Sequence, residues 1–337
     1  MSTILSYKIH TVTPYINWIY FFHAWGFQPR FAAIANIHGC DACRASWLTT
    51  FPEEERSKAS EAMQLFKEAN RMLDLLDRDY EVKTLFKLCK ANSDGDNLII
   101  EKEKDQFVTF PLLRQQTPKR DGSPFLCLSD FIRPLSSGIP DTIGAFASSI
   151  DADMEGLYEQ DPYKHLLVQT LSDRLAEAAT EKMHEYVRKE AWGYAKEENL
   201  GIADLLVEKY QGIRPAVGYP SLPDQSVNFL LDELLDMKQI GISLTENGAM
   251  YPHASVCGLM FSHPASEYFS VGKIGEDQLE DYTAAGEKAS KKCASFWQRI
   301  FNNHHSPVIF LLFSRLTNQK SNHRLHERTN NRSQSSY

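Results

Sequence analysis

The feature that most restricts how this chain can fold is the segment 212–220, Gly-Ile-Arg-Pro-Ala-Val-Gly-Tyr-Pro. Its two prolines fix backbone angles, and its two glycines allow conformations that other residues rarely adopt. Such a segment forms a rigid loop rather than a piece of packed core, and rigid loops often carry binding residues. Because this loop holds one cation, Arg214, we expect it to bind a ligand.

The composition is that of a folded domain. The 337 residues are 42% hydrophobic and 11% aromatic, which is enough for a sizeable core. No apolar run approaches the ~20 residues that span a bilayer, and the N-terminus lacks a basic segment followed by an apolar one, so we predict a cytoplasmic protein with no membrane partner. Six cysteines are too few for a disulfide framework, which agrees with a reducing compartment.

The charge is unevenly distributed. The net charge is −8, but residues 283–337 carry nine Lys or Arg against two Glu, so this tail is +7 and the preceding body is −15. An acidic body argues against a nucleic-acid partner. The tail is basic, polar and rich in Asn and Ser, which is typical of disorder. We therefore predict a folded domain over residues 1–282 and a divergent, poorly ordered tail over residues 283–337.

Hydrophobic periodicity predicts a mixture of helices and strands. Apolar residues at helical spacing predict helices over residues 54–76, 162–192 and 224–238. Turn residues and apolar runs predict an antiparallel pair over 92–100 and 107–113, further strands over 125–131 and 142–149, and a last hairpin over 254–261 and 268–274. Without an internal repeat or a flexible linker before the tail, a single α+β domain is favoured over two.

Three other patterns are weaker. Cys40 and Cys43 have the Cys-x-x-Cys spacing of redox and zinc sites, but no second such pair or His pair completes a zinc site, so we expect no metal there. His263 precedes a proline and is expected to be structural. No Gly-x-Gly-x-x-Gly follows a predicted strand, which argues against the common Rossmann mode of nucleotide binding.

Several separated motifs resemble one known family. Residues 212–220, the Leu-Thr-Glu-Asn-Gly-Ala-Met-Tyr-Pro run at 244–252 and the Ser-His-Pro run at 262–264 resemble, in the same order, the activation domain of cobalamin-dependent methionine synthase. The resemblance starts near residue 11 and ends with Gly-Glu-Asp-Gln-Leu-Glu-Asp-Tyr at 275–282. It implies one C-shaped α+β domain, with a twisted antiparallel sheet flanked by helices, that binds S-adenosylmethionine (AdoMet).

The resemblance assigns roles to residues of the loop. Arg214 would bind the AdoMet carboxylate, a task that suits its planar guanidinium. Ala216 and Gly218 would let the backbone approach the ligand, because they have little or no side chain. Tyr219 would stand where the methyl group meets the cobalamin. The alternative interpretations are a surface arginine in a turn and a partly buried turn aromatic.

Other site residues implied by the resemblance lie elsewhere in the chain. Glu177 and Glu208 correspond to acids around the family's site, where a carboxylate can neutralise a sulfonium or ammonium; without the motif, Glu177 is a solvated acid on a polar helix face. Asn17 replaces the family's usual Asp and keeps hydrogen-bonding ability without the charge. Tyr268 and Phe269 match an aromatic pair on the last strand, of which one can face the pocket, and we favour Tyr268.

Two further positions depart from the family or carry two interpretations. Val217 replaces a usual proline, and Ser-Leu-Pro-Asp-Gln at 221–225 replaces Ala-Cys-Pro-Asp-His. Glu246, in the Thr-Glu turn of the second motif, either orients a site residue or caps backbone amides.

In the family, this domain presents the AdoMet methyl group for reductive methylation of cob(II)alamin, with an electron from flavodoxin or an equivalent reductase. Modules for homocysteine, folate and cobalamin are absent from this sequence, so the resemblance implies reactivation in trans of a separate, cobalamin-bearing methionine synthase protein. No catalytic acid or base is expected, because Co(I) and the sulfonium supply the reactivity. Two alternatives stay open: an interaction protein that has lost AdoMet binding, and an enzyme of another class that uses a pocket of Glu177, Glu208 and Arg214.

Overall fold

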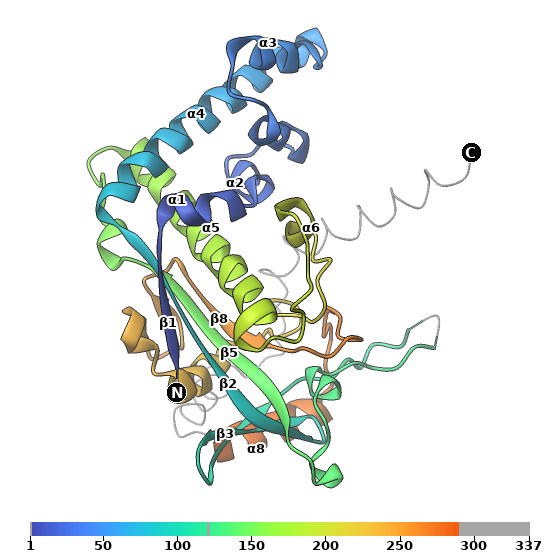
Figure 1. Ribbon diagram of the computed structural model, residues 1–337. Helices are drawn as coiled ribbons and strands as arrows, with labels where there is room; N and C mark the ends of the chain where they lie inside the picture. Colours follow the sequence, from blue (N-terminus) through green and yellow to red (C-terminus); the bar gives the residue numbers. More distant parts are fainter. Residues whose placement is uncertain (1, 120–121, 290–337) are drawn as a thin grey trace.

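An antiparallel sheet and two long helices form the framework of the structure, a computed structural model that describes residues 2–119 and 122–289 (Figure 1). The sheet has six strands in the order β4-β3-β2-β5-β8, with β1 also paired to β2, and the paired strands run antiparallel. They are β1 (Thr3–Lys8), β2 (Glu81–Asp94), β3 (Asn97–Glu103), β4 (Gln106–Pro111), β5 (Asp141–Ile150) and β8 (Ser255–Met260). The α+β class and the absence of a Rossmann sheet are as the sequence predicts.

The central strand β5 is covered on both faces. Ile143, Ala145 and Ala147 pack into one core with the helix α7 (Val227–Leu235). Phe146 faces the other way and packs with Ala176 and other residues of the helix α5 (Pro162–Tyr186). Alternate residues of a strand point to opposite faces, so a strand between two layers of helix reads as a continuous apolar run.

A separate core forms from the N-terminal helices and the first half of α5. The sequence's early aromatic cluster lies here, and Phe21 packs edge-to-face against Trp18 and Phe22. The helix α5 starts sharply, because Asp161 accepts a hydrogen bond from the Lys164 N–H at 3.2 Å and Pro162 occupies the first helical position. The other helices of this region are α1 (Ile9–Val12), α2 (Trp18–Ala24), α3 (Asp41–Thr49) and α4 (Arg56–Asp79).

Most predicted elements are confirmed with shifted ends: the three helices as α4, α5 and α7, the pair β3–β4, and the strands β5 and β8. The strand predicted over 125–131 is wrong. This segment ends in a short 3-10 helix, Leu128–Phe131, because the Asp130 carboxylate accepts the Cys127 N–H at 2.8 Å and pairs with Arg114, which turns the chain. The strands β1 and the first half of β2 were missed.

The hairpin predicted over 254–261 and 268–274 is also wrong, and the loop of the first motif explains why. Residues 213–217 run antiparallel along β8: Ile213 N–H donates to the Phe261 carbonyl at 3.0 Å, and Val217 N–H donates to the Cys257 carbonyl at 2.9 Å. The edge of β8 is therefore already paired. Residues 268–274 form no strand and are held by single contacts, such as the bond from Val271 N–H to the Pro220 carbonyl.

The last motif, residues 275–282, begins the helix α8 (Glu276–Ala289) and attaches this helix to the domain. The Gln278 side chain bonds both the N–H and the carbonyl of Arg114, at 2.7 and 3.0 Å, and the Tyr282 hydroxyl donates to Asp224 at 2.7 Å. The helix includes residues 283–289, the first part of the predicted tail. Residues 290–337 lie outside the described residues, so the boundary at residue 282 stays a prediction.

Short elements complete the described fold: α6 (Ile202–Leu206), β6 (Ser243–Leu244) and β7 (Met250–Tyr251), together with brief 3-10 turns. No helix in residues 2–119 and 122–289 is long and apolar enough to cross a membrane.

The pairing of residues 213–217 with β8 depends on Gly258. A Cβ atom at this position would lie 2.2 Å from the Pro215 carbonyl oxygen and 2.8 Å from the Ala216 Cα. We expect Gly258→Ala to lower the free energy of unfolding by about 1–3 kcal/mol in urea titrations, as overpacking does. Gly201→Ala is the matched control, because a Cβ there meets nothing within 4 Å; equal stability losses in both variants would contradict the pairing.

Candidate functional site

A stripe of polar side chains along α5 underlies the loop of the first motif. Its members recur every three or four residues and so lie on one face: Arg174, Glu177, Glu181 and His184 on α5, and Arg188 in the π-helical turn Val187–Ala191 that continues it. The C-terminal part of the stripe is buried, since Glu181 is 5% exposed and Arg188 is fully buried. Buried charges require partners, and the segments between residues 193 and 220 supply them.

Arg214 lies against the middle of this stripe. Its Nη2 donates to Oε2 of Glu181 at 2.6 Å, and its backbone N–H donates to the Tyr268 hydroxyl at 2.9 Å. Burial alone would lower the pKa of Arg214, but the negative charge of Glu181 raises that pKa well above its ordinary value. The guanidinium therefore stays charged.

Each member of the ion pair has one buried polar atom that makes no hydrogen bond within the described residues. Nε of Arg214 and Oε1 of Glu181 are both buried, and neither has a hydrogen-bond partner within the described part of the chain. Because a buried polar atom without a partner is costly, these two atoms require a water molecule, an ion or a ligand group to complete their hydrogen bonds. A donor and an acceptor on one ion pair suit a zwitterion, which brings a carboxylate and an ammonium together.

The loop is anchored to α5 a second time at Tyr219. Its hydroxyl donates to Oε1 of Glu177, one turn of α5 before Glu181. The negative charge of Glu177, together with burial, raises the pKa of Tyr219 well above its ordinary value, so the phenol stays neutral at physiological pH. Gly218 has a φ of +84°, a conformation that glycine adopts without strain.

The backbone of the loop lies directly on the sheet. Ala216 is 6% exposed and forms a β-bridge with Gly258. Gly212, at the start of the loop, has a φ of +88°, and a Cβ atom there would lie 2.4 Å from the Phe261 carbonyl oxygen. The motif residues with small side chains thus let two backbones approach closely. The structure brings Glu177, Arg214, Ala216, Gly218, Tyr219 and Tyr268 into one region.

A second buried network lies at the C-terminal end of α5 and in the π-helical turn that follows it. Arg188 donates from Nε and Nη2 to the two carboxylate oxygens of Glu198, at 2.9 and 2.6 Å, and from Nη1 to Nδ1 of His184 at 2.8 Å. An arginine only donates, so Nδ1 of His184 accepts and its ring proton lies on Nε2. The Arg188 guanidinium also lies 4.0 Å from the centre of the Tyr210 ring.

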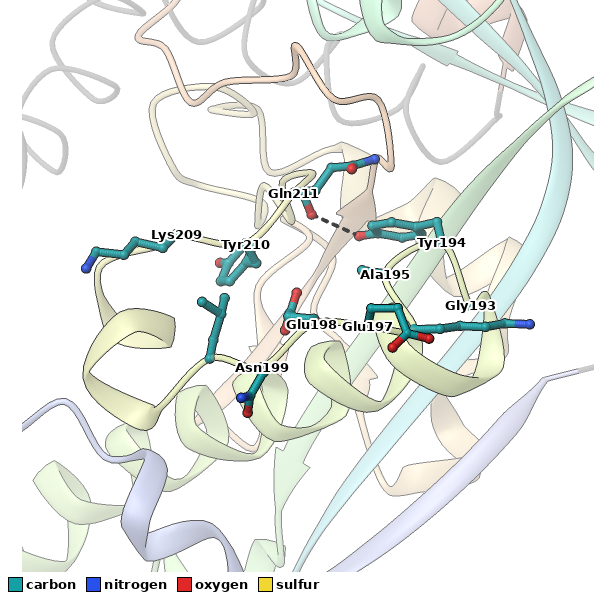
Figure 2. A pocket seen from close by; sticks show the side chains of 11 residues that line it. Gly193, Tyr194, Ala195, Glu197, Glu198, Asn199, Lys209, Tyr210 and Gln211 are labelled. Carbon is teal, nitrogen blue, oxygen red and sulfur yellow. Dashed lines mark hydrogen bonds between the residues drawn. The ribbon is translucent and has the colours of Figure 1, made fainter.

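An open cavity of about 550 Å³ borders this second network (Figure 2). Its lining comes from two segments, residues 193–200 and 209–211, and includes Glu198 and Tyr210. Figure 2 shows these segments facing each other, joined by the hydrogen bond from the Tyr194 hydroxyl to the Gln211 carbonyl at 3.3 Å. The segment that carries Gln211 continues directly into the loop with Arg214.

The other predicted site residues lie in varied settings. Glu208 has a φ of +61°, an uncommon conformation for a residue with a side chain that is often associated with function. Burial, together with the negative charge of Glu208, raises the pKa of Tyr268 to about 12, against the opposing charge of Arg214. Asn17 caps α2, where its side-chain oxygen accepts the Ile19 N–H at 3.1 Å. That contact gives Asn17 a structural role.

Tyr268 and Phe269 lie on irregular chain rather than on the predicted strand. Both side chains pack against the core under the sheet. The Tyr268 hydroxyl accepts the Arg214 N–H, and Phe269 donates its N–H to the Ser221 hydroxyl at 3.0 Å. Of the aromatic pair, Tyr268 is thus the member that contacts the loop.

Two residues of the later motifs have neighbours that explain their turns. In the turn after β6, the Thr245 hydroxyl accepts the Ala249 N–H at 3.1 Å, so Thr245 caps this turn beside Glu246. His263 accepts the Ala265 N–H through Nδ1 at 3.2 Å and stacks near Phe131, which confirms a structural role.

Sequence reasoning missed several residues of these networks. Glu181, His184 and Glu198 carry no motif of their own, and Tyr210 precedes the motif by two residues. The available signal was the spacing of charged residues along α5. From the sequence alone, this spacing is the same for a buried stripe and for a helix face in contact with solvent.

Fold and site together define an α+β binding domain of a class distinct from the Rossmann folds. The family model for the vitamin B12 dependent methionine synthase, activation domain, matches residues 8–287. A similar solved structure is the crystal structure of the MetH reactivation domain bound to AdoHcy, with 37% sequence identity, a TM-score of 0.74 and 88% of each chain covered. The chain belongs to the activation-domain family of vitamin B12-dependent methionine synthase, as its motifs indicate.

The buried His184 makes stability depend on pH. Burial, with the positive charges of Arg188 and Arg214, lowers its pKa well below the ordinary value of 6.5. The unfolded chain therefore takes up a proton below about pH 6.5 that the folded chain does not, and the stability present above this pH is lost as the pH falls. We expect His184→Gln to reduce the pH slope of the unfolding free energy by up to about 1.4 kcal/mol per pH unit.

Urea titrations between about pH 7 and pH 5 measure this slope, because His184 contributes to the pH dependence of the unfolding free energy in this range. His23→Gln, a change at an exposed histidine of α2, is the matched control and should keep the wild-type slope. An unchanged slope in His184→Gln would assign the pH dependence to other groups.

Proposed function

We propose that this chain binds AdoMet at the Arg214–Glu181 ion pair and presents its methyl group for reductive methylation of cob(II)alamin. The observation that carries the proposal is that two buried atoms of this pair, Nε of Arg214 and Oε1 of Glu181, lack a hydrogen-bond partner within the described residues. The AdoMet carboxylate accepts a hydrogen bond from Nε of Arg214, and its ammonium donates to Oε1 of Glu181. The MetH reactivation domain binds AdoHcy, which shares this amino-acid end.

The remaining site residues hold the rest of the ligand. The backbone at Ala216 and Gly218 lies against the adenosyl or amino-acid part, and Tyr219 borders the methyl group at the mouth of the site. Glu177 and Glu208 act as counter-ions for the sulfonium and ammonium. The aromatic pair Tyr268 and Phe269 contacts the adenosine part. The amide nitrogen of Asn17 also contacts it, while the oxygen of that amide caps α2.

This chain contributes position rather than acid–base chemistry. Cobalamin, held by the partner protein, supplies the nucleophile once one electron has reduced it. The cobalt–carbon bond forms as the carbon–sulfur bond breaks, and AdoHcy leaves with the electron pair on sulfur. Tyr219 stays protonated and Arg214 stays charged, so both hold the ligand without transferring a proton. Holding the methyl group in line with the attacking atom is the catalytic contribution.

The partners follow from this role. The chain acts in trans on cobalamin-binding methionine synthase modules, and flavodoxin or an equivalent reductase supplies the electron. We place the reaction in the cytoplasm, where the cysteines stay reduced; the five that the structure describes are all free thiols.

The alternative is an interaction protein that keeps the fold and has lost AdoMet binding. Two departures from the family motivate it: Asn17 in place of Asp and Val217 in place of Pro. The two functions differ in one measurable property, the affinity for AdoMet.

Isothermal titration of the purified chain with AdoMet and with AdoHcy tests the site. The most informative variant is Arg214→Lys, which keeps a positive charge beside Glu181 and removes the Nε–H donor. We expect Arg214→Lys and Arg214→Ala to weaken binding at least tenfold, or about 1.4 kcal/mol. Arg133→Ala, at an exposed arginine, is the matched control.

Thermal unfolding of Arg214→Lys establishes that the variant is folded. Absence of AdoMet and AdoHcy binding in a folded wild-type chain would favour the interaction protein. Binding that survives in Arg214→Lys would place the amino-acid end of the ligand elsewhere.

The reaction itself is tested with a cobalamin-bearing methionine synthase partner trapped as cob(II)alamin. We expect the chain, AdoMet and reduced flavodoxin together to produce the methylcobalamin absorption spectrum, because only then are electron, methyl donor and positioning all present. Arg214→Lys should slow this change in proportion to its loss of AdoMet binding. Turnover of AdoMet without any cobalamin would instead indicate an enzyme of another class.

A further inference from the structure

A cluster of three metal-ligating side chains lies outside the site at Arg214. His38, Cys40 and Cys43 each offer one ligand atom, and these atoms all lie within 4.8 Å of one another. Figure 1 shows that α3, which Cys40 caps, lies at the far end of α4, away from the sheet. The Cys-x-x-Cys spacing alone did not predict a metal here, because no second pair of ligands completes it; the fold adds His38 as a third ligand.

The backbone explains why the three side chains converge. Cys40 is the N-cap of α3, and its Sγ accepts the Cys43 N–H at 3.3 Å, which holds both sulfurs at the first turn of the helix. His38 precedes this turn by one residue, Gly39. The turn thus gathers one imidazole and two thiols from six consecutive residues.

The cluster rests on a packed support. Trp47, on the same helix α3, is 6% exposed and packs edge-to-face on Phe51 with ring centres 4.9 Å apart. Phe51 in turn stacks on Phe31 at 5.2 Å. These rings attach α3 to the N-terminal core, while His38 is exposed and the two cysteines are half-buried. The ligands therefore sit on a fixed turn at the surface, where an ion can reach them.

We propose that His38, Cys40 and Cys43 form a zinc site with its fourth position open. In a tetrahedral zinc site, with Zn–S of about 2.3 Å and Zn–N of about 2.0 Å, neighbouring ligand atoms lie about 3.5–3.8 Å apart. The three ligand atoms of the cluster lie within 4.8 Å of one another, so each pair is at most about 1 Å beyond this spacing. Two cysteines and one histidine are also a ligand set that zinc uses where it keeps one position for water or another ligand.

The open position follows from the surroundings. Asp41 is the acid nearest in sequence, but its carboxylate is fully exposed and lies 3.8 Å from Arg44. Binding of Zn²⁺ displaces the protons of both thiols, so the site releases up to two protons and holds the ion as a neutral three-ligand complex. The fourth ligand is water, or a thiolate or imidazole from another molecule.

A dithiol–disulfide pair is the competing use of Cys40 and Cys43. The position of His38 favours the metal, because its ring nitrogen lies within 4.8 Å of both sulfurs and supplies a third ligand that a disulfide does not use.

The test uses the full chain, reduced and stripped of metal with a chelator. Zn²⁺ is titrated in competition with a chromophoric zinc indicator, and Co²⁺ replaces zinc for absorption spectra. We expect one Zn²⁺ per chain and a cobalt spectrum with thiolate charge-transfer and tetrahedral bands. Affinity should fall at least tenfold in each of His38→Gln, Cys40→Ser and Cys43→Ser, and the charge-transfer band should weaken in both cysteine variants.

Two variants serve as controls, Asp41→Asn beside the cluster and His23→Gln at another exposed histidine, and both should bind zinc like the wild type. Circular dichroism establishes that each variant is folded. Wild-type protein that binds zinc no more tightly than Cys40→Ser would overturn the proposal. If that wild-type protein then formed a Cys40–Cys43 disulfide under mild oxidation, the two cysteines would be a redox pair instead.

Discussion

The buried contact between Arg214 and Glu181 is the interaction on which the rest of the site depends. It joins the rigid loop to α5, and it brings a full charge from each partner out of water. Such burial costs several kcal/mol per ion, which a single hydrogen bond only partly offsets. Two apolar residues of similar size would hold the loop as well. The chain keeps the charges, and this fits a site whose ligand completes the pair.

The sheet supplies the other half of the support. Residues 213–217 extend the sheet beyond β8, so the loop's backbone is fixed before any ligand arrives. This arrangement needs glycine at 212 and 258, where a side chain would collide with a neighbouring backbone. A ligand that meets a site fixed in this way loses less free energy to ordering the protein. Arg214 is then held between sheet and helix, with its donors in a set orientation.

Local signals made much of this structure predictable. Periodicity located α4, α5 and α7, and the Pro- and Gly-rich motif located the loop, because helix faces and restricted backbones are encoded by neighbouring residues. The strand predicted over 268–274 failed for a non-local reason: residues 213–217 had taken the edge of β8. Glu181 and His184 were missed similarly, since a charged helix face reads the same whether water or a loop covers it. His38 needed the turn into α3 before it could be recognised as a third ligand.

The helix α5 links two parts of the protein that otherwise have separate cores. Its first half, including Leu171 and Leu175, packs with α4 and the N-terminal helices, and its second half, including Met183, packs on the sheet. The charged stripe follows the same helix along its other face. The cluster of His38, Cys40 and Cys43 sits on α3, which Trp47 anchors in the first core, whereas the loop of Arg214 packs on the two faces of the sheet, so each has its own packing support. A mutation that disturbs one site should therefore spare the other, unless it shifts α5, β2 or β5, which contribute residues to both cores.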